Sequence, residues 1–199
     1  MDVTLHLQSA LEGALSLANS FGPELAFGRS LKPQTGETAR TMTAEALLLA
    51  ITTPPELTGA EVEFMGLMGA RLWTVLADAA SGNAGSAAAA VNQMLLEQDV
   101  RPYLMEHAHG PWHLHFSTPD ASPAEQWTGD FAVAIAMLLG SADAENLKLC
   151  GAIRCDRLFI DVTRNHSRRF CSTSCQTRAK VAAHRQRKQT QDGHSQIQA

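Results

Sequence analysis

Four cysteines near the C-terminal end constrain this chain more than any other feature of its sequence. They form two close pairs separated by 15 residues: Cys150 with Cys155, and Cys171 with Cys175. Two such pairs are typical of a tetrahedral zinc ion held by two short turns. Because four thiolates fill every coordination position, we expect a structural zinc ion and not a catalytic one. Disulfides and free thiols are the alternatives.

The N-terminal sequence indicates a compartment in which cysteines stay reduced. The first four residues lack the basic segment of a secretory signal, and His6, Gln8 and Glu12 interrupt the apolar residues that follow. The longest apolar runs, 46–51 and 131–139, are too short to span a bilayer. We therefore expect a cytoplasmic protein without a membrane segment, where clustered cysteines favour metal binding over disulfides.

Charge is distributed very unevenly along the chain. Residues 1–147 carry 5 Lys and Arg against 17 Asp and Glu, a net charge of -12, whereas residues 148–199 carry 11 against 3, a net charge of +8. This asymmetry predicts two parts with different roles, the second suited to a polyanion. The alternative is a basic segment that only solubilises the protein or complements its acidic part.

Hydrophobic periodicity predicts a mainly helical part before the cysteines. Thr58 with Glu61, and Ser122 with Glu125, have the spacing of N-terminal capping boxes, and Thr43 is a candidate cap of an earlier helix. The residues before that helix, 28–40, have the composition of an exposed loop. We expect helices over residues 5–19, 43–52, 59–79, 87–97, 123–139 and 142–149.

A change of period between residues 100 and 117 predicts a β-hairpin. Trp112, Leu114 and Phe116 alternate with two histidines, which is typical of a strand with one apolar face. The histidines of this segment are candidates for a metal site, but a solvent-facing hairpin is the simpler interpretation because no carboxylate or cysteine has a suitable spacing. These histidines are His107, His109, His113 and His115.

The cysteine-bearing segment predicts a hairpin followed by a helix. Residues 157–161 have the pattern of a strand, 163–167 of a polar turn and 168–170 of a returning strand, and the second cysteine pair begins a helix. The fold class is therefore α+β. We expect a mainly helical domain with a small β-hairpin over residues 1–145, a four-cysteine zinc module over residues 146–188, and a disordered tail over residues 189–199.

This module resembles the CGNR zinc-finger family. The resemblance rests on the spacing of the four cysteines, on Phe170 before the third cysteine, on Arg178, and on the basic stretch 184–187. In that family the last cysteine opens a Cys-Gly-Asn-Arg signature. Here Gln176 and Thr177 replace the glycine and asparagine, and His184 stands where a tyrosine is common.

A weaker resemblance extends upstream, because residues 17–20 are similar to an apolar–Asn–Thr element of the ABATE domain that usually precedes this finger. Together the resemblances imply a bacterial, stress-induced transcription regulator. Its finger would bind DNA, and its N-terminal domain would sense a small-molecule effector or assemble a homodimer. A zinc-stabilised protein-interaction or ligand-sensing protein without direct DNA binding is the alternative.

Basic residues around and after the second cysteine pair are suited to phosphate contact. Their charges would displace counterions from a nucleic-acid backbone and give salt-dependent binding. DNA is the expected partner, and RNA is an open alternative. The expected contacts are Arg168, Arg169, Arg178, Lys180, Arg185, Arg187 and Lys188.

Catalytic motifs give no support for an enzyme. The sequence contains no nucleophile elbow, phosphate-binding loop, dinucleotide fingerprint or zinc-protease motif. We therefore expect a protein without enzymatic activity.

Overall fold

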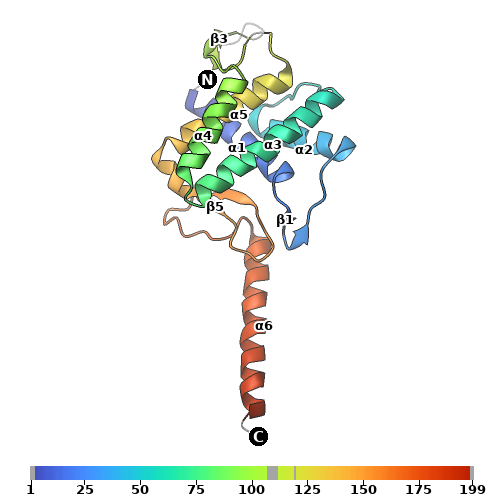
Figure 1. The fold of residues 1–199 in the computed structure, drawn as a ribbon, viewed down its shortest axis with the longest axis vertical. Coiled ribbons are helices and arrows are strands. Elements are labelled where there is room, and N and C mark those ends of the chain that lie inside the picture. Colours follow the sequence, from blue (N-terminus) through green and yellow to red (C-terminus); the bar gives the residue numbers. More distant parts are fainter. Residues whose placement is uncertain (1–2, 107–111, 119, 198–199) are drawn as a thin grey trace.

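A computed structural model describes residues 3–106, 112–118 and 120–197 of the chain. A body of packed helices occupies one end of the molecule, and a single long helix, α6, projects from it (Figure 1). Across the described residues, no helix combines the length and the apolar character needed to cross a lipid bilayer.

Five helices form the body, and the core lies between them. α1 (Val3–Phe21) packs against α2 (Gly36–Ala50), α3 (Gly59–Ala80) and α5 (Pro123–Leu139), and α4 (Ala84–Glu97) packs against α3 and α5. The apolar stripe predicted for α3 is confirmed, since Val62, Met65, Leu72 and Leu76 are buried. The predicted fold class, mainly helical with small β-hairpins and a four-cysteine module, is confirmed.

Capping explains where two of these helices begin. Thr58 and Glu61 exchange hydrogen bonds at the start of α3, and Ser122 and Glu125 do the same at α5. Both predicted capping boxes are therefore confirmed. α2 differs, because it begins at Gly36 and encloses Thr43 as a fully buried side chain instead of starting there. The buried residues of its first turns, Ala39 and Thr43, are small, which made these turns resemble a loop in the sequence.

The predicted hairpin is present, but a histidine of the face expected to be polar packs toward the helical body. β3 (Tyr103–Met105) pairs antiparallel with β4 (His113–His115). Leu104 and Trp112 are 63% and 65% exposed, whereas the His115 ring lies 6.3 Å from the His6 ring of α1. The apolar face predicted from the alternation is therefore wrong for Trp112. His107 and His109 lie outside the described residues.

The segment around the first cysteine pair also differs from its prediction. Residues 142–149, expected to be helical, form a short 3-10 helix η1 (Ala142–Asn146) and a strand β5 (Leu147–Leu149). β5 pairs antiparallel with β6 (Leu158–Ile160), so the partner of β6 is β5 and not residues 168–170. Adjacent apolar residues on β5 and β6 reach the helical core, which a hairpin with the arginine-rich segment could not do.

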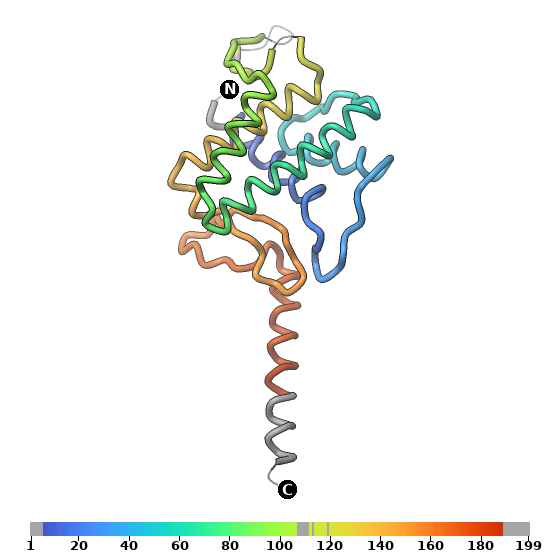
Figure 2. Tube along the Cα trace, in the orientation of Figure 1, coloured from blue at the N-terminus to red at the C-terminus, as the bar shows by residue number. Residues whose placement is uncertain are grey.

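The remaining elements are a small hairpin and the final helix. β1 (Leu25–Ala26) and β2 (Arg29–Ser30) form a hairpin that descends from the helical body toward the cysteine segment (Figure 2). α6 spans Thr173–Ile197 and so continues into the segment expected to be a disordered tail. Once a helix has nucleated, each further residue adds one hydrogen bond, which explains this continuation.

Candidate metal centre

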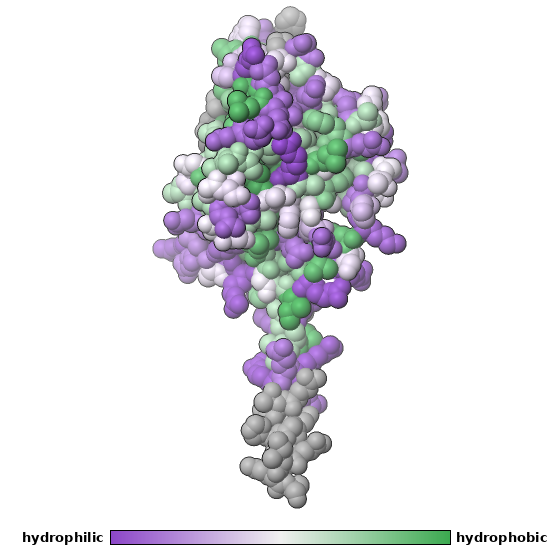
Figure 3. All heavy atoms as spheres, viewed as in Figure 1, coloured by the Kyte–Doolittle hydropathy of each residue, from purple (hydrophilic) through white to green (hydrophobic). Residues whose placement is uncertain are grey.

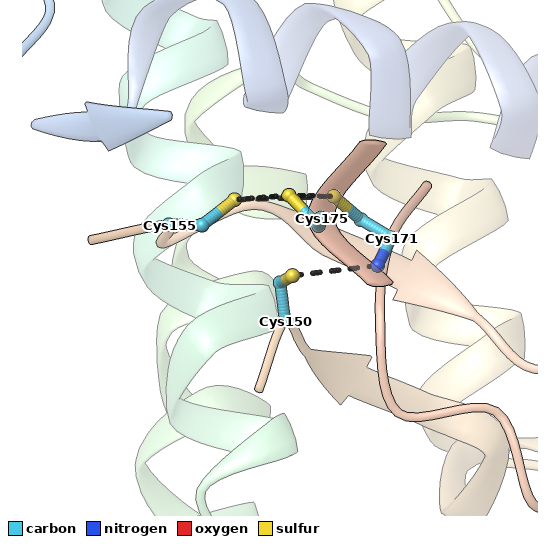
Figure 4. Close-up of side chains that lie close together, drawn as sticks. All are labelled: Cys150, Cys155, Cys171 and Cys175. Carbon is cyan, nitrogen blue, oxygen red and sulfur yellow. Dashed lines mark hydrogen bonds between the residues drawn. The ribbon is translucent and has the colours of Figure 1, made fainter. Parts of the chain in front are cut away.

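The four cysteine sulfurs converge on one point. All four Sγ atoms lie within 4.8 Å of one another. The sulfurs of Cys155, Cys171 and Cys175 are 3.7–3.9 Å apart, and dashed lines join them in Figure 4. A zinc ion with Zn–S bonds of ~2.3 Å holds its four sulfurs about 3.8 Å apart in a tetrahedron. The residues present therefore fit a structural zinc ion.

Two turns and a helix start supply the ligands. Cys150 follows β5 directly, and its N–H donates to the Arg157 carbonyl 2.9 Å away, which closes the turn that carries Cys155. Cys171 precedes α6, and Cys175 lies in its first turn. The Ser172 hydroxyl accepts the Cys175 N–H at 3.2 Å, as an N-cap does, so the sequence itself places the helix start at the second pair.

The four sulfurs are largely buried and close together. All four can therefore be ionised at once only if a cation compensates their negative charge. Burial, followed by the neighbouring cysteines, raises the pKa of Cys171 well above its usual range. Burial also raises the pKa of Cys175. A divalent ion would compensate the negative charge and displace the thiol protons, so its binding is expected to weaken on acidification.

Backbone amides surround the sulfurs. The Cys171 N–H donates to Cys150 Sγ at 3.4 Å (Figure 4). Burial opposes ionisation of Cys155, but the backbone N–H groups of Phe27 and Arg157 favour its thiolate, and the pKa of this thiol is lowered overall. Such donors orient metal ligands and share their charge. Phe27 belongs to the β1–β2 hairpin, more than one hundred residues before the first cysteine.

The half-buried Arg178 side chain is directed toward the metal centre. Its Nη1 donates to Cys175 Sγ at 3.5 Å, and its Nη2 donates to the Ile153 carbonyl at 2.6 Å. The guanidinium thus ties the helix-borne cysteine to the turn between Cys150 and Cys155. It was expected among the nucleic-acid contacts, and these hydrogen bonds also give it a role within the finger.

Arg168 is also used within the finger. Its guanidinium donates to the carbonyls of Phe170 and Cys171 and lies 5.0 Å from the centre of the Phe159 ring. Its backbone N–H donates to the carboxylate of the buried Asp161 at 2.8 Å. This arginine therefore fixes the approach to the second cysteine pair.

The other expected nucleic-acid contacts are exposed. Arg169 lies on the finger surface, and four further cations lie along α6. Gln176 and Thr177, the pair that departs from the family signature, are exposed in the first turns of the same helix. The α6 cations are Lys180, Arg185, Arg187 and Lys188.

The finger is docked on the helical body by contacts whose partners the sequence did not indicate. Asn19 is buried at the end of α1, where its side chain accepts the Leu158 N–H at 2.8 Å and donates to the Leu158 carbonyl at 2.9 Å. Trp73 Nε1 of α3 donates to the Asp156 carbonyl at 3.1 Å. Leu147 and Leu158 belong to the same apolar core as the helices. A long-range pairing of this kind leaves no local signal in the sequence.

Comparison with known proteins identifies this part of the chain. No curated protein matches the chain. The family model described as the CGNR zinc finger matches residues 146–188, which include all four clustered cysteines and α6 as far as residue 188. The segment from residue 146 to residue 188 is therefore a zinc finger of the CGNR family.

Proposed function

We propose that this protein binds DNA through its zinc finger and regulates transcription. The observation that carries the proposal is the basic helix α6, which starts at the metal centre and projects from the body (Figure 1). A zinc-anchored helix with exposed cations is a recurrent means of contacting nucleic acid. Four thiolates around the ion leave no open position for a substrate, so the proposed role is not enzymatic.

A groove beside α6 supports phosphate contact. Its volume is about 910 Å³, and it lies between the turn that carries Ile153 and the first three turns of the helix. Arg169, Lys180 and Arg185 line it. On the face shown in Figure 3, hydrophobic residues lie where α6 leaves the body, and a band of hydrophilic residues follows further along the helix. Exposed cations along a groove can follow a phosphate backbone.

The charge distribution favours one orientation on DNA. Residues 1–147 carry a net charge of -12, which phosphates would repel, and residues 148–199 carry +8. A polyanion would therefore approach the molecule from the side of α6 and the finger. A lone finger makes few base contacts, so useful specificity would require a homodimer or contacts from a second element.

A mobility-shift titration of duplex DNA across salt concentrations tests this proposal. We expect the logarithm of affinity to fall with the logarithm of salt concentration, with a slope of about -0.9 per phosphate contacted. Lys180→Ala and Arg185→Ala should each reduce the slope by about 1. Arg101→Ala, which removes an exposed cation of the helical body, is the matched control and should leave the slope unchanged.

The same titration separates the alternatives. Cys171→Ser should abolish the shift, because the helix loses its anchor at the metal centre. Tighter binding of single-stranded RNA than of duplex DNA would assign the surface to RNA. Binding that persists unchanged after metal removal, or no binding of either polymer, would contradict the proposal and favour a protein-interaction role.

A cavity in the helical body favours small-molecule sensing as a second function. It has a volume of about 610 Å³ and lies between the end of α1, the start of α2 and α3. Phe21, Val62 and Leu67 supply apolar walls, and Arg40 and Glu63 supply polar groups. Cavities of this size commonly bind small ligands.

Thermal-shift screening with small, mainly apolar compounds tests this second function. A compound that raises the unfolding temperature of the natural protein should fail to do so with Leu67→Gln, which places a polar side chain in the cavity wall. Leu96→Gln is the control, because Leu96 is also exposed but lies on α4, away from the cavity. Equal shifts in both variants would contradict binding at this cavity.

A further inference from the structure

We propose that the β1–β2 hairpin, residues 25–30, completes the metal centre from outside the finger, so that the finger retains zinc tightly only while this hairpin is docked on it. The proposal rests on the zinc site and is independent of DNA binding. It extends the metal centre beyond residues 146–188, the segment that matches the zinc-finger family. Figure 1 shows the hairpin beside the start of α6.

Backbone hydrogen bonds join the hairpin to the turn that carries Cys155. The Asp156 N–H donates to the Leu25 carbonyl at 2.8 Å, and the Leu25 N–H donates to the Asp156 carboxylate at 3.0 Å. On the other side of the cysteine, the Gly28 N–H donates to the Arg154 carbonyl at 2.9 Å. The residues immediately before and after Cys155 are thus both held by the hairpin.

The tip of the hairpin has a strained backbone. Phe27 has a φ of +52°, a left-handed conformation that is rare for a residue with a side chain. The Arg157 guanidinium lies 5.1 Å from the centre of the Phe27 ring. The strained tip is therefore held by contacts that exist only in the docked state.

Gly28 connects the hairpin to the second cysteine pair. Its φ is +87°, and a Cβ atom at this position would lie 2.6 Å from Nη2 of Arg178. That guanidinium is the one that donates to Cys175 Sγ and to the Ile153 carbonyl. The hairpin therefore contacts groups that position Cys155 and groups that position Cys175. Only glycine permits both the backbone conformation and the close approach.

Docking and metal binding are consequently linked. If the hairpin strengthens zinc binding by some factor, zinc strengthens docking of the hairpin by the same factor. Outer contacts to metal ligands typically change metal affinity 10- to 100-fold. A change in the helical body that draws this hairpin away would weaken zinc retention by a similar factor.

Gly28→Ala in the full chain tests the proposal. Zinc affinity is measured by competition with a chromophoric chelator, and helical content by circular dichroism. We expect Gly28→Ala to weaken zinc binding at least 10-fold while the helices of the body remain. Gly82→Ala is the matched control, because Gly82 also has a φ of +87° but a Cβ added there would meet no atom within 4 Å. It should carry the same backbone strain and bind zinc as the natural protein does.

A second variant tests whether the weaker zinc binding of Gly28→Ala arises only from misfolding. Asp156→Ala removes the acceptor of the Leu25 N–H without backbone strain, and it should weaken zinc binding in the same direction. Asp143→Ala, a change of the same kind in η1, should not. Zinc affinities that are equal in Gly28→Ala and Gly82→Ala, or in both aspartate variants, would overturn the proposal. These measurements use no nucleic acid, so a failure to bind DNA would leave them unaffected.

Discussion

A charged side chain of the finger can bind groups within the finger as well as a partner outside it, and Arg178 is the clearest case. Its position on a basic helix predicts a phosphate contact, yet its two terminal nitrogens bind a cysteine sulfur and a backbone carbonyl. A planar guanidinium can reach both acceptors at once, whereas a lysine ammonium on its flexible stem is a point charge. The identity of this residue should therefore matter more than its charge.

We predict that Arg178→Lys weakens zinc binding about 10-fold or more, because it loses one or both of these hydrogen bonds while retaining the positive charge. Chelator competition measures the effect. Arg187→Lys is the control, because Arg187 lies on the same helix and its Nε donates only within the helix, to the Ala183 carbonyl. Equal affinities for zinc in the two variants would show that only the charge at position 178 is required.

Asp161 supports the segment between the two cysteine pairs. It is buried, but Lys148, the Thr163 hydroxyl and N–H, and the Arg168 N–H all donate to it, and the pKa of this carboxyl is held well below its usual range. Because its pKa in the folded protein is below that in the unfolded chain, it stabilises the fold above about pH 4. That contribution is lost as the pH falls through the lower, folded-state pKa.

We predict that Asp161→Asn lowers the thermal midpoint at pH 7, and that the difference from the natural protein narrows below about pH 4. Thermal melts from pH 3 to pH 7 measure this. Asp143→Asn, in an exposed position, serves as the control. A difference that stays constant across this pH range would mean that the ionised carboxylate is not what stabilises the segment.

At the scale of elements, α1 and β6 are joined by one amide side chain. The outer edge of β6 has its Leu158 N–H and carbonyl directed away from β5, and Asn19 satisfies both. We predict that Asn19→Ala lowers the free energy of unfolding by about 3 kcal/mol, because an unsatisfied buried donor or acceptor costs about 1–3 kcal/mol.

Chemical denaturation of Asn19→Ala measures this loss. Asn92→Ala is the matched control, since Asn92 is an exposed asparagine within a helix and the substitution gives the same gain in helix propensity. If the two variants have equal free energies of unfolding, water replaces the Asn19 amide as the hydrogen-bond partner of Leu158.

Elements defined by local chemistry were predictable from the sequence. The capping boxes at Thr58 and Ser122, and the stripe beginning at Val62, depend only on residues within a few turns. The cysteine pairs were also predictable, because the ligand spacing is set by the turns themselves. These features are sufficient to predict that the fold is mainly helical and that the four cysteines form a metal site.

Elements defined by their partners were not predictable from periodicity alone. β5 was expected as helix, and its pairing with β6 across the loop that holds Cys155 was missed because the partner of β6 was sought after it, in residues 168–170, and not before it. The close approach of Gly28 to Arg178 joins segments about 150 residues apart. The contact of His115 with His6 has the same cause, since alternation gives two faces of a strand but not which one meets the body.

On the scale of the whole molecule, the finger and the helical body share one core. Leu147 and Leu158 pack among the helices, and the cysteines form a smaller cluster of their own directly beyond them. α6 alone extends away, so the acidic body and the basic helix lie at opposite ends (Figure 2). Zinc therefore stabilises a segment that the body itself packs against.

We predict that zinc removal lowers the thermal midpoint of the entire chain in one transition. Structural zinc contributes about 10–16 kcal/mol to the folding of small zinc-finger peptides. If even a third of this free energy also stabilises the helical body through β6, the thermal midpoint should fall by about 10 °C or more. The reason is that 1 kcal/mol of stability corresponds to about 2–4 °C in a chain of this size. Calorimetry with and without a chelator measures the shift, and Cys171→Ser should melt at the chelated midpoint under both conditions. Two separate transitions, with the upper one unmoved by the chelator, would show instead that the body folds without support from the finger.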